Sequence, residues 1–255
     1  MVLKREQRGP ARLLTFDRPA ARNAISRELA ERLRDEIRAV DEDEQVHAVV
    51  LASSCPDVFA SGGDLKELRQ LAMDAGGASQ VLALGVELGA LETCAVPVIA
   101  AVGGAVFGGG CELLMMCDQL VMERQASLRF VHARMGLTPA WGGTTRLIER
   151  VGSARAADIL LSARTIEAAE ALTMGLACEV VEPGQALEAA LALAERLSQL
   201  PRDALCAIKR SVLASKQARR AEAFEAERKV FRSAWGSPAH RAAFAALAGK
   251  PTQPS

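Results

Sequence analysis

The N-terminal half of the sequence alternates between short apolar runs and longer segments whose apolar residues recur at helical spacing. Strand-like runs at residues 11–17 and 46–54 flank a helical segment that begins near Ser26. On one face this segment carries Leu29, Leu33, Ile37 and Val40. A strand, a helix and a strand in this order predict an α/β fold, in which parallel strands are wrapped by helices.

The alternation continues to about residue 131. After a helical stretch at about residues 79–92, strand-like runs follow at 97–103, 118–124 and 127–131. A short helix is expected after Gly110. From about residue 142 the pattern is almost continuously helical, apart from one short strand expected at about 177–181. The chain therefore combines an α/β part with a helical C-terminal part.

Length and charge restrict the kind of partner. With 255 residues, half of them hydrophobic, the chain is long enough to bury a large core. Its formal net charge is zero, which argues against nucleic-acid and membrane-surface partners and favours a small molecule. No apolar run reaches membrane-spanning length and the N-terminus has no cleavable signal pattern, so we expect a cytoplasmic protein.

The cysteines and histidines form no metal-binding or disulfide pattern. No CxxC pair occurs and most of the cysteines lie in apolar surroundings, so we expect buried free thiols. Cys111 adjoins Glu112 but has no base beside it in the sequence, and we do not assign it as a nucleophile. Three scattered histidines are too few for a metal site, and no metal is expected.

Two glycine-rich segments carry the strongest functional signal. They span residues 59–68 and 106–118, and each has an acidic residue just after its glycines, Asp64 and Glu112. Glycines let the main chain approach a ligand closely, and a helix that follows them adds its positive amino end. Two main-chain amides aimed at one oxygen would stabilise negative charge there. The alternative interpretation is a pair of tight turns packed against neighbouring strands.

These segments resemble the crotonase, or enoyl-CoA hydratase/isomerase, superfamily. Residues 17–25 (DRPAARNAI) resemble its first coenzyme A contact segment, and the two glycine-rich segments resemble its two oxyanion-hole segments. The resemblance covers nearly the whole chain and implies an α/β spiral of ββα units. It also implies a division into a spiral core, residues 1–195, and a helical region, residues 196–255, for trimerisation and active-site cover.

The resemblance further implies the binding residues and the partners. The amides of Gly63 and Gly109 would be the oxyanion donors, and Trp141 would shape the acyl pocket or belong to the core. Coenzyme A contacts would involve Arg22, Ala24, Ala60, Asp64, Leu65 and Lys66. Coenzyme A is then part of an acyl-CoA thioester substrate, no separate cofactor is expected, and the assembly would be a homotrimer or a dimer of trimers.

The reaction depends on the residue that faces Glu112. Hydratases of this family hold a water between two glutamates, but His132 occupies the place of the second. Residues 130–147, 207–212 and 233–240 are similar to the ethylmalonyl-CoA decarboxylase branch, which implies loss of CO₂ from ethylmalonyl-CoA or methylmalonyl-CoA. Glu112 and His132 would then orient the carboxylate or donate a proton.

Other interpretations remain open for the reaction and for single residues. The chain could be an enoyl-CoA hydratase or isomerase in which His132 replaces the second glutamate, or a non-catalytic acyl-CoA-binding protein. His132 could be a core histidine, and Glu112 could serve only the dipole of its helix. The apolar face formed by Phe224, Phe231 and Trp235 fits packing on the protein's own core, or association of subunits.

Overall fold

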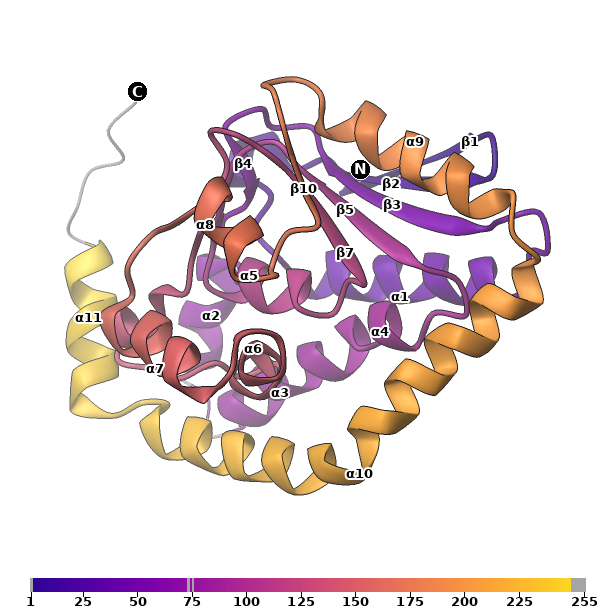
Figure 1. The fold of residues 1–255 in the computed structure, drawn as a ribbon. Coiled ribbons are helices and arrows are strands. Elements are labelled where there is room, and N and C mark those ends of the chain that lie inside the picture. The colour runs from indigo at the N-terminus through magenta and orange to yellow at the C-terminus, as the bar shows by residue number, and fades with distance from the viewer. Residues whose placement is uncertain (1, 73, 75, 249–255) are drawn as a thin grey trace.

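The strands form two sheets in the computed structural model, which describes residues 2–72, 74 and 76–248 (Figure 1). The larger sheet has the order β1-β2-β3-β5-β7-β10; β1 is antiparallel to β2 and all other neighbours are parallel. Its strands are β1 (Leu3–Arg8), β2 (Ala11–Phe16), β3 (Ala48–Ser53), β5 (Val98–Val102), β7 (Gln119–Glu123) and β10 (Glu179–Val181).

The smaller sheet has the order β4-β6-β8-β9. Its strands are β4 (Val58–Ala60), β6 (Ala105–Phe107), β8 (Ser127–Arg129) and β9 (Ile166–Glu167). Three of these strands, β4, β6 and β8, run parallel and directly follow β3, β5 and β7 of the larger sheet. The chain therefore alternates between the two sheets, and in most repeats it returns to the larger sheet through a helix. This repetition confirms the predicted α/β spiral of ββα units.

Helices cover both faces of the larger sheet (Figure 1). On one face lies α9, whose Ala186, Ala190 and Ala194 pack against the strands. On the other lies α1, which buries its predicted stripe and is capped by Ser26, whose Oγ accepts from the Leu29 amide at 3.2 Å. The α-helices are α1 (Arg27–Asp41), α2 (Leu65–Ala72), α3 (Gly77–Leu88), α4 (Ala90–Thr93), α5 (Gly109–Leu114), α6 (Gly143–Val151), α7 (Ser153–Ser162), α8 (Ala168–Thr173), α9 (Ala186–Ser198), α10 (Arg202–Ala234) and α11 (Pro238–Ala248).

Most predicted elements are confirmed with some shifts of their ends, but β9 is a second short strand in the C-terminal part, where only one was expected. The strand expected at 127–131 stops at Arg129, because a short 3₁₀ helix, η2 (Val131–Met135), follows it. The helix expected after Gly110 begins at Gly109. The predicted division after residue 195 falls within α9 and stays a prediction.

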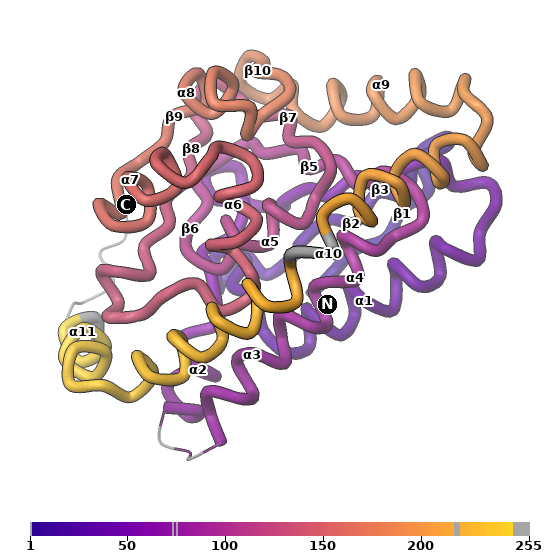
Figure 2. The backbone as a smooth tube through the Cα atoms, turned by 60° about the horizontal axis from the view of Figure 1, so that its bottom comes forward, coloured from indigo at the N-terminus to yellow at the C-terminus, as the bar shows by residue number. Residues whose placement is uncertain are grey.

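The C-terminal helices wrap around the rest of the chain (Figure 2). Helix α10 runs past α3, α4 and α6, and α11 packs against η2. Phe231 is buried and Trp235 packs on the core, so packing on the protein's own core applies to these two residues. Other apolar side chains of α10 are more than half exposed, namely Ile208, Val212 and Val230.

All six cysteines are free. Cys94, Cys111, Cys117 and Cys206 are buried as expected, whereas Cys178 is exposed and Cys55 is half-buried. Burial raises the pKa of Cys94 and Cys117 to about 12, so these thiols stay protonated at neutral pH. Within the described ranges, no helix is both long and apolar enough to cross a bilayer. The same part of the chain contains no group of three or more His, Cys, Asp or Glu side chains arranged to hold a metal ion.

Candidate active site

The carboxyl ends of three short parallel strands bring the predicted site segments together. Ala60 of β4 pairs with Val106 of β6, and Phe107 of β6 pairs with Arg129 of β8. The segments that leave these three strands therefore start side by side at one edge of the smaller sheet. They contain Gly63, Gly109 and His132, and this edge is where α/β proteins commonly bind ligands.

The two glycine-rich segments touch each other. Gly62 has a φ of +99°, and a Cβ added there would lie 3.1 Å from the Phe107 carbonyl oxygen and 3.6 Å from the Gly109 nitrogen. Only glycine fits this approach. Within the described part of the chain, neither the Gly63 nor the Gly109 N–H donates a hydrogen bond to the protein. Both amides are therefore available to a ligand oxygen.

Glu112 is buried and its carboxylate is held by main-chain amides. Oε2 accepts from the amides of Trp141 at 2.7 Å, Gly143 at 3.0 Å and Ala140 at 3.1 Å. The other oxygen, Oε1, lies 3.0 Å from Nε2 of His132 and accepts a longer bond of 3.3 Å from the Ala140 amide. Both carboxylate oxygens thus act as acceptors, and the group has little freedom to move.

His132 lies on η2 with its ring against Glu112. Its Nε2 shares a hydrogen bond of 3.0 Å with Glu112 Oε1. The other ring nitrogen, Nδ1, is buried and has no hydrogen-bond partner among the described residues. A Cβ added at Gly108 would lie 4.0 Å from Nε2, so the imidazole faces the second glycine-rich segment. The structure therefore brings Glu112, His132 and the Gly109 amide into one site.

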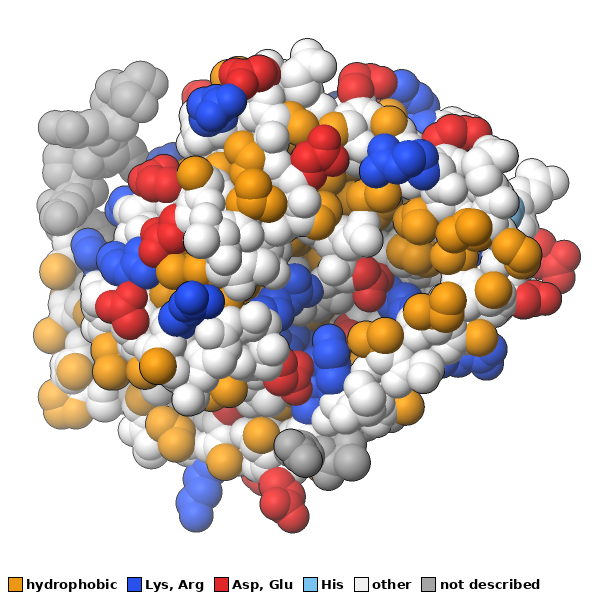
Figure 3. Space-filling model, viewed as in Figure 1, with side chains coloured by type: hydrophobic (Ala, Val, Ile, Leu, Met, Phe, Trp, Pro, Cys, Tyr) orange, Lys and Arg blue, Asp and Glu red, His pale blue; other side chains and the backbone are white. Residues whose placement is uncertain are grey.

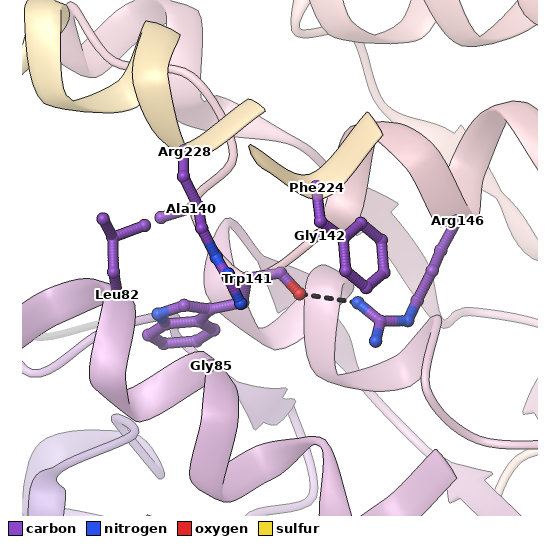
Figure 4. A pocket seen from close by; sticks show the side chains of 8 residues that line it. All are labelled: Leu82, Gly85, Ala140, Trp141, Gly142, Arg146, Phe224 and Arg228. Carbon is purple, nitrogen blue, oxygen red and sulfur yellow. Dashed lines mark hydrogen bonds between the residues drawn. The ribbon is translucent and has the colours of Figure 1, made fainter. Parts of the chain in front are cut away.

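Trp141 forms a wall beside Gly109. Its Nε1 donates to the Val81 carbonyl oxygen at 2.9 Å, and a Cβ added at Gly109 would lie 2.3 Å from Cζ3 of the indole. Figure 4 shows Arg228 reaching from α10 to the indole, while the Phe224 ring lies beside the Arg146 guanidinium; these residues line a cavity of about 30 Å³. The indole therefore limits the space next to the Gly109 amide, while the main-chain amide of Trp141 donates to Glu112.

The predicted coenzyme A contact segments are joined by main-chain hydrogen bonds. The Ser61 amide donates to the Arg22 carbonyl at 3.1 Å, and the Ile25 amide donates to the Gly62 carbonyl at 2.7 Å. The side chains of Arg22, Leu65 and Lys66 are exposed, whereas those of Ala24, Ala60 and Asp64 are buried. All six predicted residues lie on these two joined segments, and Gly63 lies within the second of them.

Arg18 and Asp64 fix this junction, and the importance of Arg18 was missed from the sequence. Arg18 donates to the Ala24 carbonyl and pairs with Asp64 at 2.7 Å, while Asp64 also accepts from the Lys66 amide at 2.9 Å. Burial acts to raise the pKa of the Asp64 carboxyl, but Arg18 and the α2 amides outweigh it, so the pKa lies below its usual value.

Two further features of the site were missed from the sequence. Gly143 leaves room for Glu112, since a Cβ there would lie 2.6 Å from the Glu112 Cγ. The paired glycines at 142 and 143 are a signal that would have suggested this. Glu227 on α10 is buried close to Glu112, and no pattern in the helical C-terminal sequence marks it.

A larger cleft of about 800 Å³ lies between α10 and the helices α1, α3 and α4. Figure 3 shows charged side chains where the face is hollowed beside α10. Five arginines and three acidic residues line the cleft, but most are paired: Arg34 with Glu87 at 2.7 Å, and both Arg146 and Arg220 with Glu92 at 2.7 and 2.6 Å. Among these pairs, Arg220–Glu92 connects α10 to α4.

The chain is similar to proteins of a known family. The family model for enoyl-CoA hydratase/isomerase matches residues 8–247. The chain belongs to this family. It is therefore a crotonase-superfamily enzyme of the kind that acts on acyl-CoA compounds.

Individual crotonase relatives carry different activity names. A probable enoyl-CoA hydratase from Rhizobium meliloti (strain 1021) is 37% identical over 248 residues, which cover 96% of this chain and 94% of the relative. The ethylmalonyl-CoA decarboxylase of Mus musculus is 31% identical over 236 residues, covering 91% and 73%. A crystal structure of an enoyl-CoA hydratase/isomerase from Pseudoalteromonas atlantica T6c is 27% identical with a TM-score of 0.85, covering 97% and 96%.

Proposed function

We propose that the protein is an acyl-CoA lyase that decarboxylates a 2-alkylmalonyl-CoA, either ethylmalonyl-CoA or methylmalonyl-CoA. The observation that carries this proposal is the hydrogen bond of 3.0 Å between His132 Nε2 and Glu112 Oε1. Hydratases of this family hold a water between two glutamates. In this chain Glu112 Oε1, which accepts only one long bond of 3.3 Å from an amide, faces an imidazole instead, and decarboxylation needs no activated water.

The oxyanion hole would supply the driving interaction. When the bond between the α-carbon and the carboxylate breaks, CO₂ leaves and the electron pair passes into the thioester as an enolate. The enolate oxygen would accept from the amides of Gly63 and Gly109, which are available for this role. Such donors stabilise the transition state more than the ground state, and one of them is typically worth about 10²- to 10³-fold in rate.

The enolate then needs a proton on its α-carbon. We assign this transfer to the Glu112–His132 pair, which takes its replacement proton from water, so that one proton is consumed for each CO₂ released. Arg22, Ala24, Ala60, Asp64, Leu65 and Lys66 would bind coenzyme A on the two joined segments, and Trp141 would limit the size of the acyl group.

A second candidate is hydration of a 2-enoyl-CoA. It is favoured by the name of the Rhizobium meliloti relative, which is more similar in sequence than the mouse decarboxylase. In this case His132 would take the place of the second glutamate in handling the water.

Product analysis tests the two candidates directly. The purified protein is incubated separately with ethylmalonyl-CoA, methylmalonyl-CoA and crotonyl-CoA, and the products are identified by mass. We expect butyryl-CoA or propionyl-CoA with release of CO₂. His132→Ala should lower kcat by about 10²-fold or more while acyl-CoA binding persists, and His47→Ala, at a histidine outside the site, should not. Water addition to crotonyl-CoA with no reaction of either malonyl thioester would refute the decarboxylase proposal.

We further propose that the C-terminal helical region assembles the chain into a homotrimer or a dimer of trimers and covers the active site. The proposal is supported by Ile208, Val212 and Val230, which leave apolar surface on α10 more than half exposed.

A further inference from the structure

A second buried carboxyl group lies close to the site, on the C-terminal helix α10. Only 8% of Glu227 is exposed. Its Oε2 accepts from the Thr145 amide at 3.1 Å and from the Thr145 hydroxyl at 3.2 Å. Its other oxygen, Oε1, is buried and has no hydrogen-bond partner among the described residues. A carboxyl group with one buried, unpartnered oxygen is costly to keep, so its presence calls for an explanation.

Glu227 and Glu112 bind the same structure, the amino end of α6. Glu112 comes from α5 and accepts from the Gly143 amide, whereas Glu227 comes from α10 and accepts from the Thr145 amide two residues further on. The first amides of a helix have no partners within the helix and carry partial positive charge. Two carboxyl groups from distant parts of the chain therefore share one helix start, and the charge of one acts on the other.

The other charged groups on the elements that pack against α10 have partners of their own. Glu92 of α4 holds Arg146 and Arg220, and Arg220 also pairs with Glu149 of α6. Glu87 of α3 pairs with Arg34. On α10 itself, Arg228 lies 3.9 Å from Glu225. The charge that bears most on Glu227 is consequently that of Glu112, which His132 contacts on its other side.

We propose that Glu227 is a positioning residue of the active site. By holding the amino end of α6 from the C-terminal helix, it fixes the main-chain amides that grip Glu112, and its own charge sets the field around the Glu112–His132 pair. This inference rests on the proposed function only in giving that pair the chemistry, and it holds for decarboxylation and hydration alike.

The charge of Glu227 changes in a useful range of pH. Burial, and then the nearby Glu112 carboxylate, raise its pKa to about 7. Below this pH Glu227 is neutral and still accepts from Thr145. Above it, a second negative charge faces Glu112 across the same helix start, competes for the same partial positive charge and loosens the hold on Glu112.

The test compares the wild type with Glu227→Gln, which keeps the shape and the acceptor oxygen but never ionises. With whichever substrate the wild type converts, kcat and KM are measured from about pH 5.5 to about pH 8.5. We expect the two proteins to agree at the acid end. Above about pH 7 the wild type should lose on the order of tenfold in kcat through an inflection that Glu227→Gln lacks, with little change in KM.

Two further variants complete the comparison. Glu227→Ala also removes the hydrogen bonds to Thr145 and should lower kcat at every pH. Glu225→Gln, at an exposed acid on the same helix, should follow the wild type. Identical profiles for the wild type and Glu227→Gln, or a fully active Glu227→Ala, would overturn the proposal.

A readout without turnover separates this proposal from the proposed function. Because the folded-state pKa of Glu227 lies above its unfolded value, the wild type binds more protons when folded and loses stability as pH rises toward about 7. The Tm of Glu227→Gln should therefore rise relative to the wild type between about pH 5 and about pH 8. If no acyl-CoA is converted, the proposed function fails, but the Tm measurement still tests the proposal for Glu227. Tm values of the wild type and Glu227→Gln that change equally with pH would contradict that proposal.

Discussion

The main chain holds the carboxylate of Glu112 in place. Glu112 accepts from the amides of Ala140, Trp141 and Gly143, and His132 is the only side chain hydrogen-bonded to it among the described residues. Gly143 is needed for space, because its Cα faces the Glu112 carboxyl group directly. Glu112 can therefore occupy this position only because Gly143 has no side chain.

Gly143→Ala tests this interpretation. The added Cβ would lie 2.6 Å from Cγ and 2.7 Å from Oε2 of Glu112, so the carboxyl group must move. We expect kcat to fall by about 10²-fold, because displacing a catalytic group by about 1 Å has effects of this size. Ile148→Ala on the same helix, at an exposed side chain, serves as the control. The kcat and the Tm of each variant are measured. A Gly143→Ala protein that matches the wild type in both would contradict the interpretation that Gly143 leaves room for Glu112.

At the same scale, the sequence predicted some of the site and not the rest. Glu112, His132, Gly63 and Gly109 were predicted because they lie in sequence motifs whose residue types themselves suggest the chemistry. The amides that hold Glu112 carry no side-chain signature, and Glu227 lies 115 positions after Glu112 in a helix whose pattern looks ordinary. Such contacts arise from packing between distant segments, which residue spacing does not report.

At the level of elements, helices and strands were predicted correctly where they are long enough to show a periodic pattern of apolar residues. The stripe of α1 and the apolar strands of the larger sheet were predicted for this reason. The strands β4 and β6 have three residues each, too few to show alternation. Helix α10 lies in the part expected to be almost continuously helical; its residues 216–221 contain neither glycine nor proline, and the helix continues through them.

The junction of the two contact segments gives a prediction at this scale. Arg18→Leu removes the partner of Asp64 and the donor to the Ala24 carbonyl, and should lower the free energy of unfolding by about 1–3 kcal/mol near pH 7. Because the folded-state pKa of Asp64 is lowered, its stabilisation is present at neutral pH and is lost as pH falls below about 4.

The stability difference between Arg18→Leu and the wild type should therefore shrink in acid. Urea unfolding at about pH 7 and about pH 3 measures it. Arg32→Leu, which removes an exposed pair with Glu28 on α1, is the matched control. A difference of the same size at both pH values would show that Asp64 is not the group responsible.

For the whole molecule, the apolar residues left exposed on α10 predict assembly. We expect a mass three or six times the 27.0 kDa of one chain in analytical ultracentrifugation. Ile208→Glu combined with Val212→Glu should shift the protein toward smaller species, because burying unpaired charge at a contact is costly. Leu161→Glu, at a highly exposed leucine of α7, should leave the mass unchanged. A wild-type protein that sediments as a monomer would refute the proposed trimer.

The order in which the site is assembled along the chain has a consequence for protein synthesis. Gly63, Gly109, Glu112 and His132 all precede residue 140, but the amides that hold Glu112 follow at 140–143, and the Thr145 amide of α6 donates to Glu227 of α10. A growing chain on the ribosome would thus contain these four predicted site residues before α10, which completes their surroundings, has been synthesised. Enzymatic activity should appear only in the last steps of synthesis. A chain that is terminated before α10 should be inactive and should not catalyse a different reaction.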